Sequence, residues 1–319
     1  MVPTMVNSSS GPVIGVDLGG TSVKAALVSA DLELLAYDAT PTDVSDEDVL
    51  LTEIEQLVRR IAGDSGVVAV GFGLPSQIDQ RRGIVADSIN VPITDVPFVA
   101  EMTGRLKLPV KVDNDANVAC LAEARIGAGK GRDNVIMLTL GTGVGGGIVL
   151  DGRLYHGATG YGGELGHIVI DENGPPCQGH CPNHGCLESF ASAAGVRAAA
   201  AQIAAERPGG TLATAAAAQT SIDTRFVIDG ALDGDQDCID ALAIVGRHLG
   251  VGIANYVNIF NPDVVVVGGG IMAAGEILLG VARDEAGRRA LRPPWGEVEV
   301  VAADLGNDAG VLGAAALVL

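Results

Sequence analysis

The sequence predicts an α/β fold with one large or two medium domains, and three observations point to it. Short runs of valine, isoleucine and leucine alternate with longer helical patterns along the 319 residues, as in sheets covered by helices on both faces. Aromatic residues make up only 3% of the chain, so an aliphatic core is expected. A unit of two strands around a Gly/Thr turn occurs twice, beginning at Val13 and at Val135, which indicates an internal duplication.

The first half of the chain is expected to alternate between strands and helices. The expected strands are 13–17, 23–28, 67–72 and 110–112, and the expected helices are 45–62, 97–106 and 116–128. Ser45 is the expected N-cap of the first helix, because acidic residues fill the turn that follows it.

The second half of the chain opens with a glycine-rich hairpin and is then mainly helical. The expected elements are strands at 135–138 and 147–150, an alanine-rich helix at 187–205, a long helix at about 238–260, a buried strand at 263–267, a helix at about 274–290, a strand at 298–301 and a last helix at 309–319.

Composition excludes several classes of protein. The formal net charge of −19 argues against nucleic acid and anionic membrane surfaces as partners. No apolar run reaches the roughly 18 residues of a membrane span, and the first twelve residues have no signal-peptide pattern. Five cysteines, three of them within ten residues, do not resemble a secreted disulfide framework. A cytoplasmic enzyme is therefore expected.

A carboxylate, Asp17, ends the first strand directly before the tight turn Gly19–Thr21. This arrangement suits Mg²⁺ and nucleotide phosphates, because Mg²⁺ prefers carboxylate ligands and the N–H groups of such a turn can face phosphate oxygens. The turn lacks the G-K-[ST] ending of a Walker A loop. An ordinary hairpin is the alternative.

Two further glycine turns follow buried strands. Gly141–Gly143 joins the two strands of the expected hairpin and offers backbone N–H groups to an anion. Gly268–Gly270 follows the strand at 263–267, where the lack of side chains lets a flat adenine or a ribose approach the backbone. Glycine turns between a strand and a helix are common, and an ordinary turn is the alternative.

Asp113, Asn114 and Asp115 stand at the end of the strand 110–112. Ligands of open α/β sheets gather at the carboxyl ends of strands, and a carboxylate placed there can act as general base on a hydroxyl. The alternative is that Asp113 or Asn114 caps the helix that follows.

The loop from Cys177 to Cys186 is dense in cysteine and histidine. Three cysteines with nearby histidines in a Pro/Gly-rich loop of a cytosolic chain predict tetrahedral Zn²⁺. The expected ligands are His167, Cys177, Cys181 and Cys186, and His180 or His184 can substitute for one of them. Reduced cysteines without a metal are the alternative.

Taken together, these motifs resemble those of the ROK family of sugar kinases and repressors, within the actin-like ATPase superfamily. The resemblance covers nearly the whole chain from Val13, and its most specific parts are Leu140-Gly-Thr-Gly with Gly146, Gly163-Glu-Leu-Gly-His167, and Gly185-Cys-Leu-Glu188. It implies two ribonuclease-H-like domains with an active-site cleft between them. The expected boundaries are 1–116 with about 304–319 for the small domain and 117–303 for the large one, with the zinc loop at 167–188.

The resemblance also implies roles for particular residues. Asp115 is implied to accept the proton of the sugar hydroxyl, and His167 to bind zinc through one ring nitrogen and face the sugar with the other. The implied contacts to ATP and Mg²⁺ are Asp17, Gly19, Gly20, Thr21, Thr142, Gly143, Gly268, Gly269 and Gly270. The implied sugar contacts are Asn90, Asn114, Asp115, Glu164, His167 and Glu188.

The chain departs from the family pattern at two places. Cys177 and Cys181 have the spacing C-x-x-x-C where the family usually has C-x-C, which makes Cys177 the least certain zinc ligand. Ser76 stands where the family commonly has glycine, so a side chain can reach the sugar pocket.

The resemblance implies ATP-dependent phosphorylation of a hexose at its C6 hydroxyl, with glucose as the first expected substrate. The alternatives are a kinase for mannose, fructose or N-acetylmannosamine, and a glucokinase that uses polyphosphate. A sugar-sensing regulator is the least favoured alternative, because only about a dozen residues precede the first strand, which leaves no room for a helix-turn-helix. Family habit suggests a homodimer or homotetramer.

Overall fold

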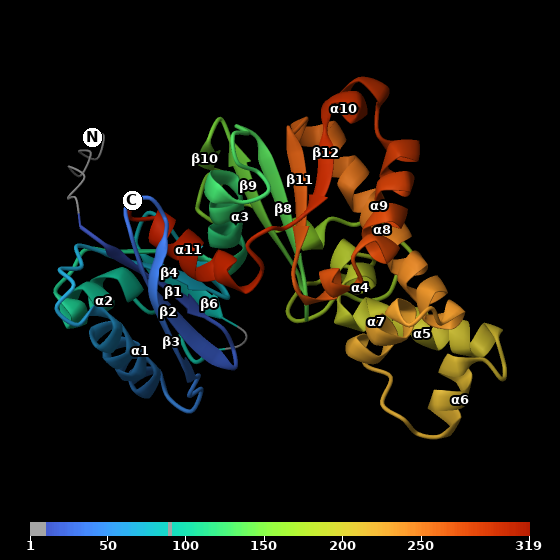
Figure 1. Cartoon of the computed structure of the whole chain (residues 1–319), viewed down its shortest axis with the longest axis horizontal. Helices are drawn as coiled ribbons and strands as arrows, with labels where there is room; N and C mark the ends of the chain where they lie inside the picture. The colour runs from blue at the N-terminus through green and yellow to red at the C-terminus, as the bar shows by residue number, and fades with distance from the viewer. Residues whose placement is uncertain (1–10, 89–90) are drawn as a thin grey trace. The chain divides into compact units, whose positions relative to one another are not determined.

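The computed structural model describes residues 11–88 and 91–319, which form two compact units (Figure 1). The first unit runs to Gly127 and adds Leu154–Gly163 and Asn307–Leu319, and the second comprises Ala128–Arg153 and Glu164–Gly306. A compact unit is defined by packing and a domain by independent folding, so the domain boundaries expected from the sequence stay a prediction. No helix within the described ranges is long and apolar enough to cross a bilayer.

The first unit contains a five-stranded sheet in the order β3-β2-β1-β4-β7. Its strands are β1 (Val13–Leu18), β2 (Ser22–Val28), β3 (Leu34–Pro41), β4 (Val70–Leu74) and β7 (Val110–Asn114). The first three strands are antiparallel, whereas β4 pairs with β1 and β7 pairs with β4 in parallel. A separate hairpin consists of β5 (Ser76–Asp79) and β6 (Ile84–Ser88).

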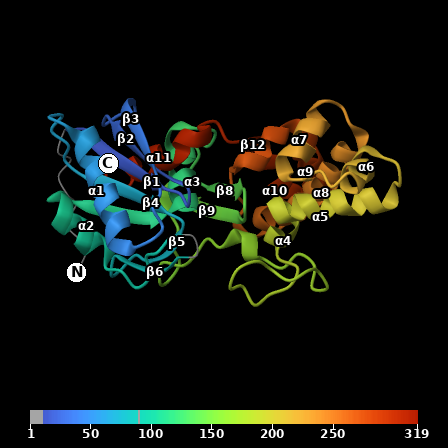
Figure 2. The same ribbon diagram turned by 90° about the horizontal axis from the view of Figure 1, so that it is seen from below.

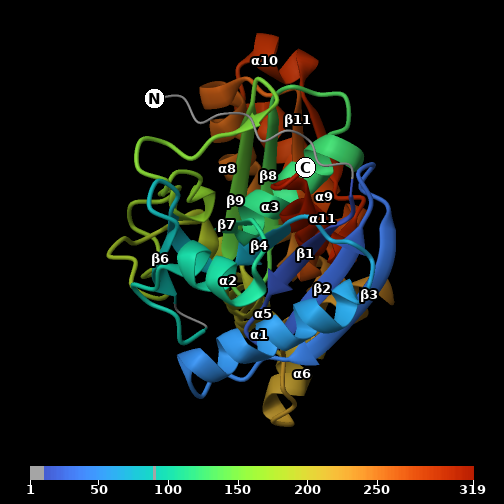
Figure 3. The same cartoon turned by 90° about the vertical axis from the view of Figure 1, so that its left-hand side faces the viewer.

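Four helices pack on this sheet, α1 and α2 on one face and α3 and α11 on the other (Figure 3). They are α1 (Glu47–Ala62), α2 (Phe98–Leu106), α3 (Asp115–Ile126) and α11 (Ala309–Ala316). The expected N-cap at Ser45 is wrong. The carboxylate of Asp46 accepts hydrogen bonds from the N–H groups of Asp48 and Val49 instead, at 2.9 and 3.2 Å.

The last helix, α11, lies directly on the backbone of the first sheet. A Cβ at Gly15 in β1 would be 1.8 Å from the Val311 carbonyl oxygen, and a Cβ at Gly71 in β4 would be 1.8 Å from that of Ala314. Only glycine permits this approach. Because α11 is thereby fixed close to the sheet, its N-terminus comes to the end of β1, where Asp17 stands.

The second unit contains a sheet with the same layout, in the order β10-β9-β8-β11-β12. Its strands are β8 (Val135–Leu140), β9 (Val144–Leu150), β10 (Arg153–Leu154), β11 (Val264–Gly268) and β12 (Glu299–Ala302). Strands β8 and β9 are antiparallel, and β11 pairs in parallel with both β8 and β12. The two sheets therefore share one strand order, as the internal duplication predicted.

The helices of the second unit surround the long helix α8. They are α4 (Leu187–Ala191), α5 (Ala193–Glu206), α6 (Thr211–Ala217), α7 (Thr224–Leu232), α8 (Gln236–Phe260), α9 (Glu276–Arg289) and α10 (Arg292–Glu297), with short 3-10 turns at Leu165–His167 and Gly270–Ala274. A third 3-10 turn, Gly306–Asp308, lies where the chain passes from the second unit to the first. The single helix expected at 187–205 is wrong, because Ser192 is extended (φ −88°, ψ 179°) and divides it into α4 and α5. The cysteine-rich loop before α4 projects from the helices (Figure 2).

The buried apolar side chains form one cluster in each unit. Both are mostly aliphatic, as the low aromatic content predicted, although Phe72 and Phe98 lie in one and Tyr256 in the other. Val264–Val267 of β11 is fully buried. Four consecutive buried valines are typical of a parallel strand covered on both faces.

The glycine contact under α11 can be tested by substitution. In Gly71→Ala the added Cβ would overlap the Ala314 carbonyl, so we expect a loss of about 1–3 kcal/mol in the free energy of unfolding. The matched control is Gly104→Ala in α2, where a Cβ meets no atom within 4 Å and a helical glycine costs about 0.5–1 kcal/mol relative to alanine. Urea denaturation measures both. Equal effects of the two substitutions would contradict the close packing of α11.

Candidate active site

In the first unit, residues near the carboxyl ends of three neighbouring strands pair with one another across the sheet. Asp17 of β1 pairs with Gly73 of β4, and Gly73 pairs with Asp113 of β7. Asp115 follows at the start of α3. The carboxyl ends of parallel strands are where α/β folds bind ligands, and this edge carries three carboxylates.

The carboxylate of Asp17 lies between a cation and a helix end. Lys24 of β2 places its Nζ 3.6 Å from Asp17 Oδ2. At the start of α11, a Cβ on Gly310 would be 2.6 Å from the carboxyl carbon of Asp17, so a glycine is needed there. Burial raises the pKa of Asp17, and the nearby Lys24 opposes that rise without cancelling it. A carboxylate in this setting favours a further cation, such as the Mg²⁺ expected from the sequence.

Asp115 has the most displaced carboxyl pKa of this edge. Burial, followed by the negative charge of Asp17, raises its pKa to about 6, and the hydrogen bond from the Ala116 N–H at 2.8 Å lowers it only in part. A carboxyl group with a pKa near 6 is ionised at neutral pH and is a stronger proton acceptor than an ordinary aspartate. This chemistry fits the general base expected from the sequence.

Asn114 caps α3, as the alternative interpretation of this motif predicted. Its side-chain oxygen accepts from the N–H groups of Ala116 and Asn117, at 2.9 and 3.3 Å. Its amide donates to the Ser76 carbonyl at 3.4 Å. The cap does not use all hydrogen-bonding capacity of the side chain, so the sugar contact stays a prediction. Asn90, also predicted to contact the sugar, lies outside the described residues.

The turn Gly19–Thr21 is closed by its own backbone and by Thr42, which the sequence did not indicate. The Gly19 N–H donates to the Ser22 carbonyl at 2.9 Å. The Thr42 hydroxyl donates to the Gly19 carbonyl at 2.7 Å, and the Thr42 N–H donates to the Thr21 carbonyl at 3.1 Å. With its carbonyls engaged in this way, the turn keeps a fixed shape.

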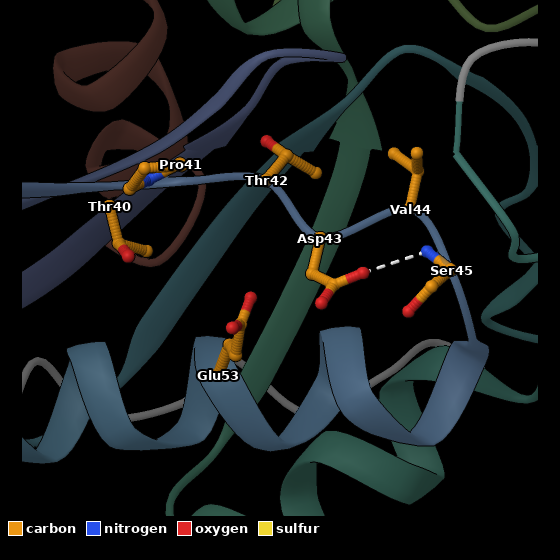
Figure 4. A pocket seen from close by; sticks show the side chains of 7 residues that line it. All are labelled: Thr40, Pro41, Thr42, Asp43, Val44, Ser45 and Glu53. Carbon is orange, nitrogen blue, oxygen red and sulfur yellow. Dashed lines mark hydrogen bonds between the residues drawn. The ribbon is translucent and has the colours of Figure 1, made fainter.

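Thr42 also lines an open hollow of about 510 Å³ between the end of β3 and α1 (Figure 4). The other lining residues are Thr40, Pro41, Asp43, Val44, Ser45 and Glu53. None of the seven is basic and two are acidic, so the hollow is unsuited to a phosphate. It is not part of the candidate site.

In the second unit, two glycine segments predicted from the sequence come together. The Gly141 N–H donates to the Gly143 carbonyl at 2.9 Å, which closes the expected β8–β9 hairpin around Thr142. Gly268 pairs with Thr139, and Gly269 (φ +90°) lies against the backbone of Leu140. The glycines at 268–270 therefore adjoin the strand end that leads into the 141–143 turn.

Glu188 of α4 contacts that same turn. Its Oε2 accepts from the Val144 N–H at 2.9 Å. A Cβ at Gly143 would be only 2.3 Å from this oxygen, so the glycine makes room for the carboxylate. The other oxygen, Oε1, lies 3.7 Å from the Cys177 sulfur. Glu188 thus joins the glycine turn to the cysteine-rich loop.

His167, Cys177, Cys181 and Cys186 form a compact group whose ligand atoms all lie within 4.8 Å of one another. Cys177 Sγ is 3.4 Å from His167 Nδ1, and Cys181 Sγ is 3.9 Å from Cys186 Sγ. Zn–S and Zn–N bonds of about 2.3 and 2.0 Å place tetrahedral ligands roughly 3.5–3.8 Å apart. The donor set and the spacing therefore fit a tetrahedral metal site. The group includes Cys177, the ligand left least certain by its spacing.

The same geometry bears on the protonation of these residues. Burial and the neighbouring thiols raise the pKa of Cys177 to about 12. A divalent cation among the four would deprotonate the thiols it coordinates. Apolar burial alone does not explain the group, because its loop is largely exposed and polar.

The sugar contacts predicted for the second unit lie near one another. His167 directs Nδ1 to the thiols and places Nε2 4.0 Å from Glu164 Oε2. Burial raises the pKa of the Glu164 carboxyl most, His167 lowers it and the charge of Glu188 raises it. Glu164, His167 and Glu188 are thus brought together at the junction of the metal group and the glycine turn.

Comparison with known proteins agrees with the motifs. The model of the ROK family matches residues 13–319. This chain belongs to the ROK family. A glucokinase of Thermotoga maritima is 38% identical over 309 residues, which cover 96% of each chain. This family membership and the expected actin-like ATPase fold are confirmed.

Solved structures of the ROK family include an enzyme and a regulator. A ROK glucokinase of Streptomyces griseus in complex with glucose and AMPPNP superposes with a TM-score of 0.82 at 33% identity, covering 96% of this chain and 99% of that one. A ROK transcriptional regulator, a homologue of the E. coli MLC protein, superposes with a TM-score of 0.86 at 31% identity, covering 98% of this chain and 79% of the regulator. Fold similarity alone therefore does not separate kinase from regulator.

The displaced pKa of Asp115 predicts an effect on stability. A carboxyl group whose pKa rises from 3.8 to about 6 on folding destabilises the protein above pH 6 and has no such effect below about pH 4. We expect Asp115→Asn to raise the free energy of unfolding at pH 7.5 by about 1–3 kcal/mol. That gain should disappear between pH 6 and 4.

Thermal and urea denaturation at pH 4 and 7.5 measure this effect. The control is Asp64→Asn at an exposed position, which should change stability little at either pH. An Asp115→Asn variant that is no more stable than the parent at pH 7.5 would contradict the burial of this carboxylate.

Proposed function

We propose that this protein transfers the γ-phosphoryl group of ATP to the C6 hydroxyl of glucose. The observation that carries the proposal is Asp115, a partly buried carboxylate with a pKa of about 6 at the start of α3, directly after β7. It occurs in a chain that is 38% identical to a named glucokinase over nearly its full length. A regulator would not need a proton acceptor of this kind.

Asp115 is the general base of the proposed reaction. It accepts the proton of the attacking hydroxyl, and its raised pKa increases its affinity for that proton. Asn114, held by its cap on α3, orients a neighbouring hydroxyl through its amide. Glu164, His167 and Glu188 of the second unit are the remaining proposed sugar contacts. Phosphoryl transfer depends mainly on positioning and electrostatics, so these few groups suffice.

The donor phosphates are assigned to the two glycine turns. Gly19, Gly20 and Thr21 of the first unit, and Thr142 and Gly143 of the second, present backbone N–H and hydroxyl groups suited to phosphate oxygens. Gly268–Gly270 leave space for the nucleoside. Bound Mg²⁺ would neutralise phosphate charge, and Asp17 is the carboxylate placed to hold it. Lys24, 3.6 Å from Asp17, is a further cation at this edge.

We further propose that the group of His167, Cys177, Cys181 and Cys186 holds structural Zn²⁺. Four protein ligands complete a tetrahedron and leave no position for a reactive water. The ion would fix the ring of His167 through Nδ1 and so direct Nε2 toward the sugar hydroxyls. It would also hold the loop against which Glu188 packs.

Removal of a ligand tests the zinc proposal. We expect Cys181→Ser to lower bound zinc from about one equivalent to well under half, and to lower the melting temperature by several degrees. The matched control is His184→Gln, a histidine of the same loop outside the metal group, which should keep full zinc. Elemental analysis and thermal unfolding measure both. An active parent enzyme purified without zinc would refute the proposal.

The sugar and the donor need separate tests. Mannose, fructose and N-acetylmannosamine are the alternative acceptors, and polyphosphate is the alternative donor. Ser76 bears on this choice, because its hydroxyl is buried and has no hydrogen-bond partner among the described residues. We also propose that the protein is cytoplasmic and forms a homodimer or homotetramer.

A coupled assay over these four sugars, with ATP and with polyphosphate, tests the proposed function. We expect the highest kcat/KM with glucose and ATP. Since the base must be ionised, kcat/KM should rise with pH through about 6. Asp115→Ala should lower kcat by at least about 10³-fold while glucose still binds, as calorimetry can show. Near-normal turnover by this variant would refute the role of Asp115 as general base. No turnover of any sugar by the parent would refute the proposed function.

A further inference from the structure

The segment Leu154–Gly163, here called the crossing segment, belongs to the first unit although the chain on both sides of it belongs to the second. Three contacts fasten it. His156 meets Asp113 of β7, the Arg81 guanidinium donates to the Ala158 carbonyl at 2.5 Å, and Gly160 lies on the backbone of the β5–β6 hairpin. The first of these contacts reaches the strand end that carries the proposed base.

The contact between His156 and Asp113 is short and largely removed from water. His156 Nε2 lies 2.6 Å from Asp113 Oδ2, and the side chain of Asp113 is only 3% exposed. The hydrogen bond to Asp113 raises the pKa of His156, against the opposing effect of burial. Hydrogen bonds between an imidazolium and a carboxylate are among the stronger ones in proteins.

The second oxygen of Asp113 holds the start of α3. Asp113 Oδ1 accepts from the backbone N–H of Asn114 at 2.8 Å and from the side-chain amide of Asn117 at 2.9 Å. One buried carboxylate therefore connects the crossing segment, the last residue of β7 and the first turn of α3. Asp115 is the next residue along the chain, so its position depends on this junction.

We propose that His156 is a positioning residue for the phosphoryl transfer: by holding Asp113 it fixes the β7–α3 junction from which Asn114 and Asp115 project. The inference rests on the proposed function, because it assigns His156 an effect on the general base. His156 itself takes no proton from the substrate. Displacing a reacting group by about 1 Å can cost about 100-fold in rate, so loss of this contact should lower kcat more than it changes sugar binding.

A double-mutant cycle tests the connection. We expect His156→Phe and Asp113→Asn each to lower kcat by about 10–100-fold, with the KM for glucose changed by less than about 3-fold. If His156 acts through Asp113, the double variant should be no slower than the slower single variant, because the two changes remove one interaction. His156→Gln keeps a donor that can reach Asp113 and should restore part of kcat.

The control variant is Arg81→Ala, which removes another anchor of the crossing segment without touching Asp113. It should keep kcat within about 3-fold of the parent. An equal loss of kcat in Arg81→Ala would show that kcat depends on anchoring the crossing segment and not on the contact of His156 with Asp113. Single effects that multiply in the double variant would also overturn the inference.

A second measurement separates this inference from the proposed function. Hydrogen exchange of the Asn114 amide, followed by mass spectrometry or NMR, needs no turnover. It should accelerate in His156→Phe and stay unchanged in Arg81→Ala. If the parent phosphorylates no sugar, the proposed function fails. The exchange rates still show whether His156 holds the β7–α3 junction through Asp113. If the parent is active and His156→Phe changes neither kcat nor exchange, the inference alone fails. If His156→Phe does not fold, His156→Gln replaces it in both measurements. In that case an Asp113→Asn variant whose kcat and Asn114 exchange rate equal those of the parent would overturn the inference.

Discussion

The first unit depends on keeping carboxylates close together where water is scarce. Asp17 and Asp113 stand in one row of the sheet, and Asp115 begins the next helix. Burial and the charge of Asp17 make Asp115 harder to ionise, which costs stability at neutral pH. Contacts elsewhere in the first unit have to offset this loss of stability. They also have to hold the carboxylates in fixed positions.

That rigidity comes from contacts between backbones rather than from large side chains. Helix α11 rests on Gly15 and Gly71 at distances that admit no Cβ, and Gly310 brings its first turn against Asp17. Thr42 and Asn114 then fix the two loops at this edge by hydrogen bonds. The repulsion between the carboxylates is thus opposed by the close packing of α11 at the glycines and by the hydrogen bonds of Thr42 and Asn114.

Much of the fold could be predicted because its signals are local. Continuous apolar runs gave strands such as β1, β8 and β11, and the long helix α8 lies within two residues of its expected start. Strand β3 was missed because it is an edge strand whose residues are mostly exposed, so it lacks a buried run. The break at Ser192 was missed because an alanine-rich sequence favours helix on both sides of it.

The candidate site divides in the same way. The metal group could be predicted, since three of its four ligands occur within ten residues and thiols have few other reasons to gather in a polar loop. The contact of His156 with Asp113 could not be predicted, because the two residues are 43 positions apart and no spacing pattern connects them. Lys24 and Thr42 are similar cases, since the pairing of strands brings them to the site.

The duplicated sheets place different chemistry at equivalent positions. In the first unit Asp17 stands one residue before the end of β1, whereas in the second unit Thr139 stands at the equivalent position of β8. Strand β8 then runs into a turn of glycine and threonine. A carboxylate can face a phosphate only through a cation, while backbone N–H groups need none. On the proposed function, the cation therefore belongs with the first unit. The acidic residue at the second turn, Glu188, is consistent with this division, because its Oε2 already accepts a hydrogen bond from the Val144 N–H.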